Sequence, residues 1–377
     1  MILSRTSVIV QFDKNTQRIA AIDWLRGLVM MLMALDHTSW FFNEHRIFAD
    51  SVLLYESGDL FAADQFLTRW ITHICAPTFI FLAGTAIAIS NTQRREQGMS
   101  HSVIDRELLI RGAFIAFIDL CIFSLASGQV LLQVLYAIGI SMMLMVPLQR
   151  LGQRAVLFLA IVILAGSEVL LRAWWEPGGE VPLWLALTFA PVLGETYTVL
   201  YPALPWLAIM MLGWAFGERL MSKQPGLWPV ERLLRVSGLS ALVLFVVIRS
   251  IDGYGNLFMY LEGDTLVQWL HISKYPPSLA YTLLELGLMA MILAVMIRIE
   301  PFIGIRKNGF VLVYGQTALF FYLAHFCILG VLNPFIEQGG LLQTYLITVL
   351  VLVILYPLCR MYRTLKWSHP QSLLRFL

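Results

Sequence analysis

The stretch RIAAIDWLRGLVMMLMALDH, residues 18–37, predicts an apolar helix that carries charged and imidazole side chains within it. A helix crosses the hydrocarbon of a bilayer with about 20 mostly apolar residues, and this stretch is of that length. An ionisable side chain inside a membrane is costly and usually marks a functional site. The side chains in question are Asp23, Arg26, Asp36 and His37. We therefore expect the membrane interior of this protein to serve chemistry or transport, and not only anchoring.

The composition of the whole chain predicts a multi-pass membrane protein. Of the 377 residues, 59% are hydrophobic and only 13% are charged, with a mean hydropathy of +0.75. Soluble domains are closer to half apolar and a quarter charged. The net charge of +2 gives no reason to expect nucleic acid as a partner. The 4 cysteines lie in apolar runs without a CxxC pair, so neither a disulfide framework nor a metal site is expected.

Hydropathy divides the chain into ten candidate spans, which predicts an all-α fold, a polytopic transmembrane helix bundle forming a single domain over residues 1–377. The tails 1–20 and 363–377 are expected to be cytoplasmic. The segment 181–193 is apolar but short and broken by proline, which predicts an interfacial or re-entrant position. The ten spans are 21–42, 69–90, 107–126, 129–148, 155–171, 202–220, 234–251, 278–298, 309–332 and 341–362.

The loops between these spans alternate in charge. Most of the 26 basic residues fall on the side of the membrane that holds both termini, whereas the opposite side collects acidic residues. Lys and Arg are enriched in short cytoplasmic loops, so this alternation predicts that both termini are cytoplasmic. The lipid bilayer is thus an expected partner of the chain.

Polar side chains of separate spans fall at one depth once this orientation is fixed. At about 1.5 Å per helical residue, they occupy one layer in the outer half of the membrane. A lone histidine in a membrane helix often only bonds a neighbouring helix, but convergence at one depth favours a shared site. The layer consists of His37, His73, His325, Asp36, Glu168 and Glu285.

Other charged and aromatic residues extend this layer. Arg26 and His37 are eleven positions apart and return to nearly the same helix face, which could line a shaft from the inner to the outer side. Arg111 and Asp119, eight positions apart, predict an internal charge pair. Near the outer surface, a small molecule or glycan has three candidate binding residues, Lys274, Tyr275 and Trp40.

Five segments of the sequence, taken in order, resemble a known family. The segment 18–37 is followed by RWITHICAPTFIFLAGTA (69–86), and three further segments fit the same pattern. They are YPALPWLAIMMLGWAFG (201–217), KYPPSLAYTLLELG (274–287) and YGQTALFFYLAHFCILG (314–330). Together they resemble the bacterial membrane family DUF1624, which is grouped with the catalytic domain of heparan-alpha-glucosaminide N-acetyltransferase.

The resemblance implies a transmembrane acyltransferase in the bacterial inner membrane. Cytoplasmic acetyl-CoA would give its acetyl group to an amino sugar or another glycan on the outer side. The lysosomal member of the family has an Asn where this chain has His37 and an Asp where it has His73. Its catalytic histidine lies in the loop between these spans, where this chain has only His45.

Acyl transfer needs a base for the acceptor's proton and a donor that stabilises the oxyanion. Imidazole is the natural base near neutral pH. We therefore expect His37 or His73 as the base, oriented by Asp36 or Glu285. His325 would orient the acceptor or hold the oxyanion. Two residues nearer the inner side, Arg26 and Arg111, would meet the phosphates of the cofactor, although structural pairing is equally open.

Two other functions are consistent with the same residues. Buried layers of His, Asp and Glu also form proton relays, so a proton-coupled transporter is the main alternative. Many transporters have inverted repeats with broken helices in matching positions, and we find no such symmetry in this sequence. A membrane scaffold would leave the polar layer without a role. The sequence also leaves a homodimer open.

Overall fold

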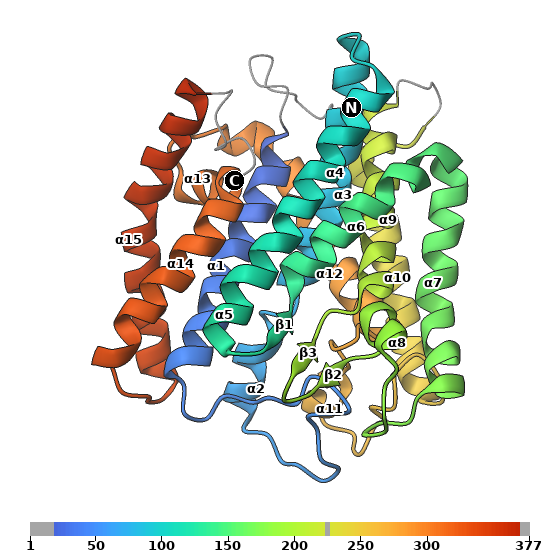
Figure 1. Ribbon diagram of the computed structural model, residues 1–377, viewed down its shortest axis with the longest axis vertical. Coiled ribbons are helices and arrows are strands. Elements are labelled where there is room, and N and C mark those ends of the chain that lie inside the picture. The colour runs from blue at the N-terminus through green and yellow to red at the C-terminus, as the bar shows by residue number, and fades with distance from the viewer. Residues whose placement is uncertain (1–18, 223–226, 370–377) are drawn as a thin grey trace, which may run out of the picture.

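Long helices that run side by side form the body of the protein (Figure 1). The computed structural model describes residues 19–222 and 227–369. The long helices are α1 (Ala20–Phe42), α3 (Cys75–Glu96), α4 (His101–Ile118), α6 (Val134–Leu148), α7 (Gln153–Trp174), α9 (Ala203–Met221), α10 (Val230–Ile251), α12 (Leu279–Ile303), α14 (Ala318–Leu332) and α15 (Leu341–Ser368). The short ones are α2 (Ala63–Trp70), α5 (Ser124–Ser127), α8 (Leu183–Thr188), α11 (Leu266–Leu270) and α13 (Phe310–Gln316), with η1 (Asp119–Phe123), η2 (Gln149–Leu151) and η3 (Asn333–Phe335).

Seven helical segments of the described chain are long and apolar enough to cross a membrane. This confirms the prediction of a helical, multi-pass membrane protein. The expected count of ten spans is not confirmed and stays a prediction. The helices α1, α4 and α9 run alongside the others in Figure 1, but they carry charged residues that lower their hydropathy.

Most helix bounds lie within a few residues of the predicted spans, and the differences are local breaks. The predicted span 69–90 is divided into α2 and α3, and 309–332 is divided at Thr317 into α13 and α14. The predicted tail 363–377 begins inside α15, which continues to Ser368. The remaining tail residues, 1–18 and 370–377, lie outside the described residues.

A small sheet makes the all-α prediction incomplete. Its strands are β1 (Val130–Leu132), β2 (Val192–Leu193) and β3 (Tyr197–Val199), in the order β1-β3-β2. β1 pairs with β3 in parallel, and β2 pairs with β3 in antiparallel orientation. The segment 181–193 contributes α8 and β2 to this region and does not form a long helix.

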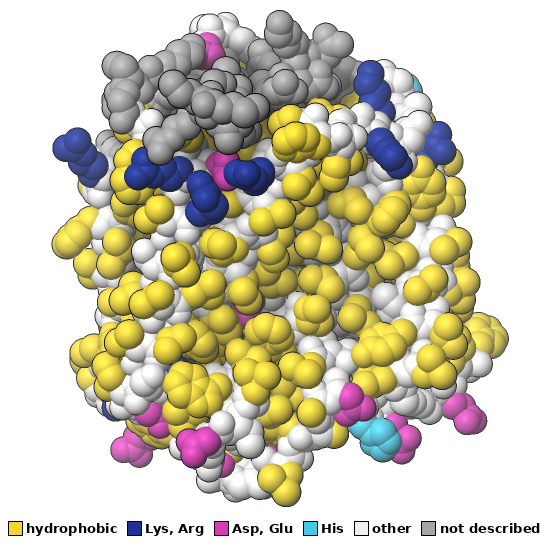
Figure 2. All heavy atoms as spheres, turned by 180° about the vertical axis from the view of Figure 1, so that it is seen from behind, with side chains coloured by type: hydrophobic (Ala, Val, Ile, Leu, Met, Phe, Trp, Pro, Cys, Tyr) yellow, Lys and Arg dark blue, Asp and Glu magenta, His cyan; other side chains and the backbone are white. Residues whose placement is uncertain are grey.

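The two ends of the bundle differ in charge. In Figure 2, Lys and Arg side chains gather toward one end, and Asp and Glu side chains toward the other. We name the first the basic end, where α3 ends and α4 begins, and the second the acidic end, which holds the loops 43–62 and 252–278. This separation agrees with the charge alternation read from the loops.

Two glycines let α1 and α13 cross in close contact. A Cβ atom at Gly27 would lie 1.8 Å from the carbonyl oxygen of Val311, and one at Gly315 would lie 1.8 Å from that of Asp23. No side chain fits at such distances, so both positions require glycine. The crossing places the start of α14 against α1 and thereby positions the site described next.

Candidate functional site

A pair of histidines joins α1 to α14. Nδ1 of His37 lies 2.7 Å from Nε2 of His325, and the two rings are stacked with centroids 4.9 Å apart. Nδ1 of His325 lies 3.1 Å from the carbonyl oxygen of Phe321, one turn earlier in the same helix. His325 is fully buried, whereas His37 is only partly buried.

These contacts determine which nitrogens carry protons when both rings are neutral. A carbonyl oxygen only accepts hydrogen bonds, so Nδ1 of His325 is the donor to Phe321. Nε2 of His325 is then unprotonated and accepts the proton of Nδ1 of His37. This leaves Nε2 of His37 with a free lone pair, and the structure gives that nitrogen no hydrogen-bond partner among residues 19–222 and 227–369. His37 therefore has the protonation state of a general base.

A cavity of about 670 Å³ leads from the basic end toward this pair. On α1 its wall includes Asp23, Arg26, Met30 and Met33. Residues at these spacings share one face of a helix, and His37 is the next position on that face. The predicted shaft along the Arg26–His37 face is thus partly present, as a cavity that begins near the start of α1, passes Arg26 and ends at Met33, one helical turn before His37.

Tyr322 connects the cavity with the histidine pair. Its side chain lines the cavity, and its ring centroid lies 6.2 Å from that of His37 and 5.6 Å from that of His325. Phe326 packs on His37 from the same helix, with centroids 4.4 Å apart. α14 therefore supplies both the end of the cavity and the partner of the base.

Three arginines line the part of the cavity near the basic end. Arg26 forms an ion pair of 2.8 Å with Asp23, and Arg94 forms one of 2.6 Å with Glu107. Arg111 has no ion pair within the described ranges, and both other arginines repel it electrostatically. The cavity therefore has a surplus of positive charge, which suits an anionic ligand.

The predicted pair of Arg111 with Asp119 is wrong. Asp119 is buried in η1, where its carboxylate accepts hydrogen bonds from the backbone N–H groups of Gln133 (2.7 Å) and Tyr136 (3.0 Å). Eight helical residues separate the two positions by about 12 Å along the axis, which is too far for a direct ion pair, and the backbone at the start of α6 engages the Asp119 carboxylate instead. This aspartate fixes the turn into α6.

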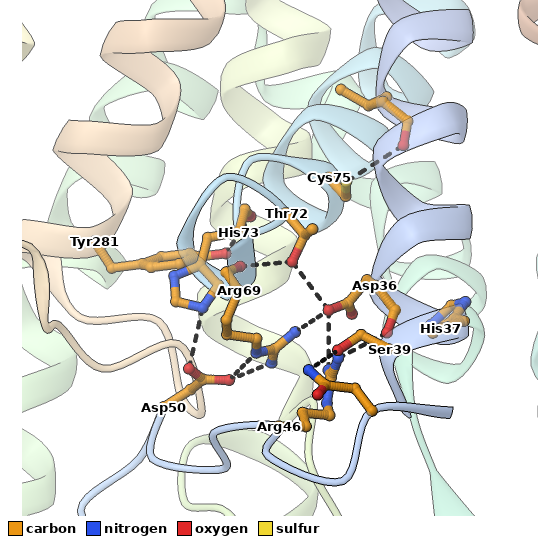
Figure 3. A network of polar contacts seen from close by, with 12 residues as sticks. Asp36, His37, Ser39, Arg46, Asp50, Arg69, Thr72, His73, Cys75 and Tyr281 are labelled. Carbon is orange, nitrogen blue, oxygen red and sulfur yellow. Dashed lines mark hydrogen bonds and ion pairs between the residues drawn. The ribbon is translucent and has the colours of Figure 1, made fainter. Parts of the chain in front are cut away.

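A second polar cluster lies on another face of α1, at the acidic end (Figure 3). The carboxylate of Asp36 accepts hydrogen bonds from Arg46 (2.9 Å), Thr72 (3.0 Å) and Arg69. Arg69 also bonds Asp50, which in turn lies 3.0 Å from Nε2 of His73. We call these residues the acidic-end network: Asp36, Arg46, Asp50, Arg69, Thr72 and His73.

The network separates residues that the sequence placed together. Figure 3 shows His37 turned away from it, and Asp36 contacts arginines and Thr72 instead of His37. The carboxylate beside His73 is Asp50, a loop residue that was not among the expected site residues. No spacing rule identifies this partner, because Asp50 lies in a loop whose path depends on tertiary contacts.

Asp50 is held ionised by its neighbours. Burial works against its charge, but the Arg69 guanidinium and His73 outweigh that effect and lower the pKa of this carboxyl below its ordinary value. Its backbone carbonyl also accepts hydrogen bonds from the N–H groups of Lys274 (2.8 Å) and Tyr275 (3.2 Å). Asp50 thus ties the loop 43–62 to the segment that begins α12.

The other predicted site residues lie around the network. The ammonium group of Lys274 is buried 5.1 Å from the ring centre of Tyr275, and that side chain forms no ion pair within the described residues. Glu285 is buried, and its Oε1 has no hydrogen-bond partner in the same part of the chain, so it orients neither His37 nor His73.

Trp40 and Glu168 do not line the cavity. Trp40 is 53% exposed and packs against Phe48 and the guanidinium of Arg46, a member of the acidic-end network. Glu168 accepts hydrogen bonds from Arg172 and from the backbone of Gly255 (2.6 Å), so it holds the loop after α10.

Comparison with known protein families shows which family this chain belongs to. Residues 18–261, more than half of its length, match the family described as heparan-alpha-glucosaminide N-acetyltransferase, catalytic. The chain belongs to this family. No curated protein matches it. An N-acetyltransferase family fits an acyl-CoA donor. The phosphate groups of such a donor are anionic, which agrees with the arginines that line the cavity.

The acetyltransferase family match covers only part of the site. It includes α1 to α10, and with them His37, His73 and the arginines of the cavity. Lys274, Glu285 and His325 follow the matched range, so their roles rest on geometry alone. The described residues hold no group of three or more His, Cys, Asp or Glu side chains placed to bind a metal ion.

Proposed function

We propose that this protein transfers an acetyl group from acetyl-CoA, which enters at the basic end, to an amino sugar or another glycan acceptor at the acidic end. The observation that carries the proposal is the cavity whose α1 wall passes Arg26 and ends at Met33, one turn before a histidine with an unprotonated, unpaired nitrogen. The positive-inside rule would place the basic end in the cytoplasm, and the bacterial inner membrane is the membrane we expect.

The cavity fits the donor in charge and in shape. Arg111 has no carboxylate partner in the described chain and lies near Arg26, which makes this region suitable for phosphate groups. Deeper in the membrane the lining is largely apolar, with Met30, Leu82 and Ile138, as a long pantetheine arm requires. Acetyl-CoA would supply the thioester that reacts at the deep end.

His37 would take the proton of the acceptor. As the amine or hydroxyl attacks the thioester carbon, Nε2 of His37 accepts the proton, and a base in this position contributes about 10² to 10⁴ in rate. His325 holds the ring through the 2.7 Å hydrogen bond and selects the required tautomer. The thiolate of the departing cofactor then recovers the proton.

His73 is the less suitable base because of its position. Its Nε2 is engaged by Asp50 and its Nδ1 is buried without a partner among the described residues, but neither His73 nor another member of the acidic-end network lines the cavity. His37, in contrast, contacts the cavity-lining Tyr322.

We assign His73 and Asp50 to the acidic-end network that shapes the acceptor side. Lys274 and Tyr275 adjoin this network and are the acceptor-binding candidates, and Trp40 remains one for a long glycan that extends along the outer surface.

The test uses the full-length chain purified in detergent, with acetyl-CoA binding by calorimetry and acetyl transfer to glucosamine as readouts. His37→Gln is expected to retain binding and lose at least about 100-fold in turnover. His101→Gln, an exposed position at the start of α4, is the matched control and keeps both.

Three results would overturn the proposal. Absence of acetyl-CoA binding by the wild-type protein excludes the donor. Loss of transfer in His45→Gln with full activity in His37→Gln assigns the role of the base to the exposed His45. Movement of a solute across proteoliposomes, driven by a proton gradient and independent of acetyl-CoA, would establish the transporter instead.

A further inference from the structure

Tyr322 occupies the position where the cavity meets the histidine pair. It is 5% exposed, lines the cavity and contacts both imidazole rings through its own ring. Its hydroxyl has no hydrogen bond to any described residue. A buried tyrosine hydroxyl normally finds a partner, so this one is available to a ligand.

Two other polar side chains of the cavity, Thr85 and Gln316, are committed to structural contacts. The hydroxyl of Thr85 lies 3.0 Å from the carbonyl oxygens of Phe81 and Gly213 and shares its one proton between them. Gln316 bonds Asp23 near the basic end, far along α1 from His37. Tyr322 is thus the cavity-lining hydroxyl that also touches the base.

We infer that the hydroxyl of Tyr322 is the hydrogen-bond donor for the carbonyl oxygen of the acyl thioester. This inference rests on the proposed function and adds to it the group that stabilises the oxyanion, which is one of the two roles expected for His325. His325 does not fit that role, because its Nε2 accepts from His37 and its Nδ1 donates to Phe321.

The reaction step balances with these groups. The acceptor's lone pair forms a bond to the carbonyl carbon, and the π electrons of the C=O bond move onto oxygen, which Tyr322 stabilises by donating its O–H. The acceptor's proton passes to Nε2 of His37. When the C=O bond re-forms, the C–S bond breaks, the electron pair leaves on sulfur, and the imidazolium of His37 returns the proton to that thiolate.

Tyr322→Phe isolates the hydroxyl, because the phenyl ring keeps the packing against both histidines. Loss of one oxyanion donor lowers turnover about 100- to 1000-fold, and we expect this loss with unchanged acetyl-CoA affinity. Tyr356→Phe is the matched control, since its hydroxyl bonds the carbonyl oxygen of Asn308 and does not line the cavity. It should keep turnover within about twofold.

The possible outcomes distinguish a failure of the role of Tyr322 from a failure of the proposed acetyltransferase function. Full turnover in Tyr322→Phe, with a wild-type enzyme that transfers acetyl groups, overturns the role of the hydroxyl and leaves the proposed function intact. A tenfold or greater loss of acetyl-CoA affinity in Tyr322→Phe assigns the hydroxyl to ground-state binding, which also overturns the inference. A wild-type protein that neither binds acetyl-CoA nor transfers its acetyl group overturns both.

Discussion

Replacing Arg69 with methionine tests whether the acidic-end network is held together by compensated charge. The Arg69 side chain is 7% exposed and bonds two carboxylates, Asp36 and Asp50. Without it, Asp36 keeps Arg46 and Thr72 as partners, whereas Asp50 keeps His73. The variant thus leaves the buried carboxylate of Asp50 without a guanidinium to balance its negative charge.

The expected loss of unfolding free energy in each variant follows from these contacts. Removing one partner of a buried ion pair costs about 3–5 kcal/mol, because the remaining charge is left uncompensated. Asp50→Asn alone leaves Arg69 bonded to Asp36 and loses hydrogen bonds to a charged group, at about 1.5–3 kcal/mol. The double variant no longer buries the Asp50 charge, so its cost should fall below the sum of the single costs by at least about 1 kcal/mol.

The measurement is the free energy of unfolding in detergent at pH 7, where the lowered pKa of Asp50 keeps that carboxyl ionised. Arg95→Met is the control, because Arg95 pairs with Glu218 at 3.7 Å with 42% and 27% of the two side chains exposed. Such a pair contributes at most about 1 kcal/mol. Additive costs in the double variant, within about 0.5 kcal/mol, or a loss in Arg69→Met no larger than in the control, would refute the reasoning.

Three further substitutions probe the helix crossing, the donor site and the histidine pair. Gly315→Ala places a Cβ 1.8 Å from a carbonyl oxygen of α1 and should lower the unfolding free energy by about 1–3 kcal/mol. Gly166→Ala, with nothing within 4 Å, should be neutral or stabilising, and equal effects would contradict the close crossing. Arg111→Gln should weaken acetyl-CoA binding about tenfold at unchanged thermal stability, and unchanged calorimetric affinity would remove Arg111 from the donor site. His325→Phe should lower turnover at least about tenfold, because His37 loses its hydrogen-bond acceptor, and full activity would show that the pair is dispensable.

Hydropathy was sufficient to predict most of the helices because each long apolar segment carries its own signal. The breaks were harder, since Thr317 divides α13 from α14 without a proline, and an apolar run of helical length gives no sign of it. The strand β1 was assigned to a span for a related reason. Its residues, 130–132, are apolar, and only their pairing with residues 197–199 distinguishes them from the start of a helix.

Those parts of the candidate site that depend on the face of a single helix, or on the depth of a residue in the membrane, could be predicted from the sequence. The 3.6-residue period put Arg26 and His37 on one face, and the depth of each span put His37 level with His325, to which it is bonded. The contribution of the loops was not predictable, and Asp50 was missed for that reason. Nor was the role of Tyr322, because the rotation of α14 about its own axis follows from packing against α1.

The consecutive positions Asp36 and His37 explain how the network and the histidine pair depend on each other. Neighbouring helical residues project about 100° apart, so the carboxylate that engages Arg69 on one side directs the imidazole toward α14 on the other. A rotation of α1 that released Asp36 would also break the 2.7 Å contact between His37 and His325. Apolar residues in place of the network would stabilise the bundle at least as well, since buried ion pairs contribute little net stability. Their contacts have no direction, however, and would leave the rotation of α1, and with it the position of His37, less well determined.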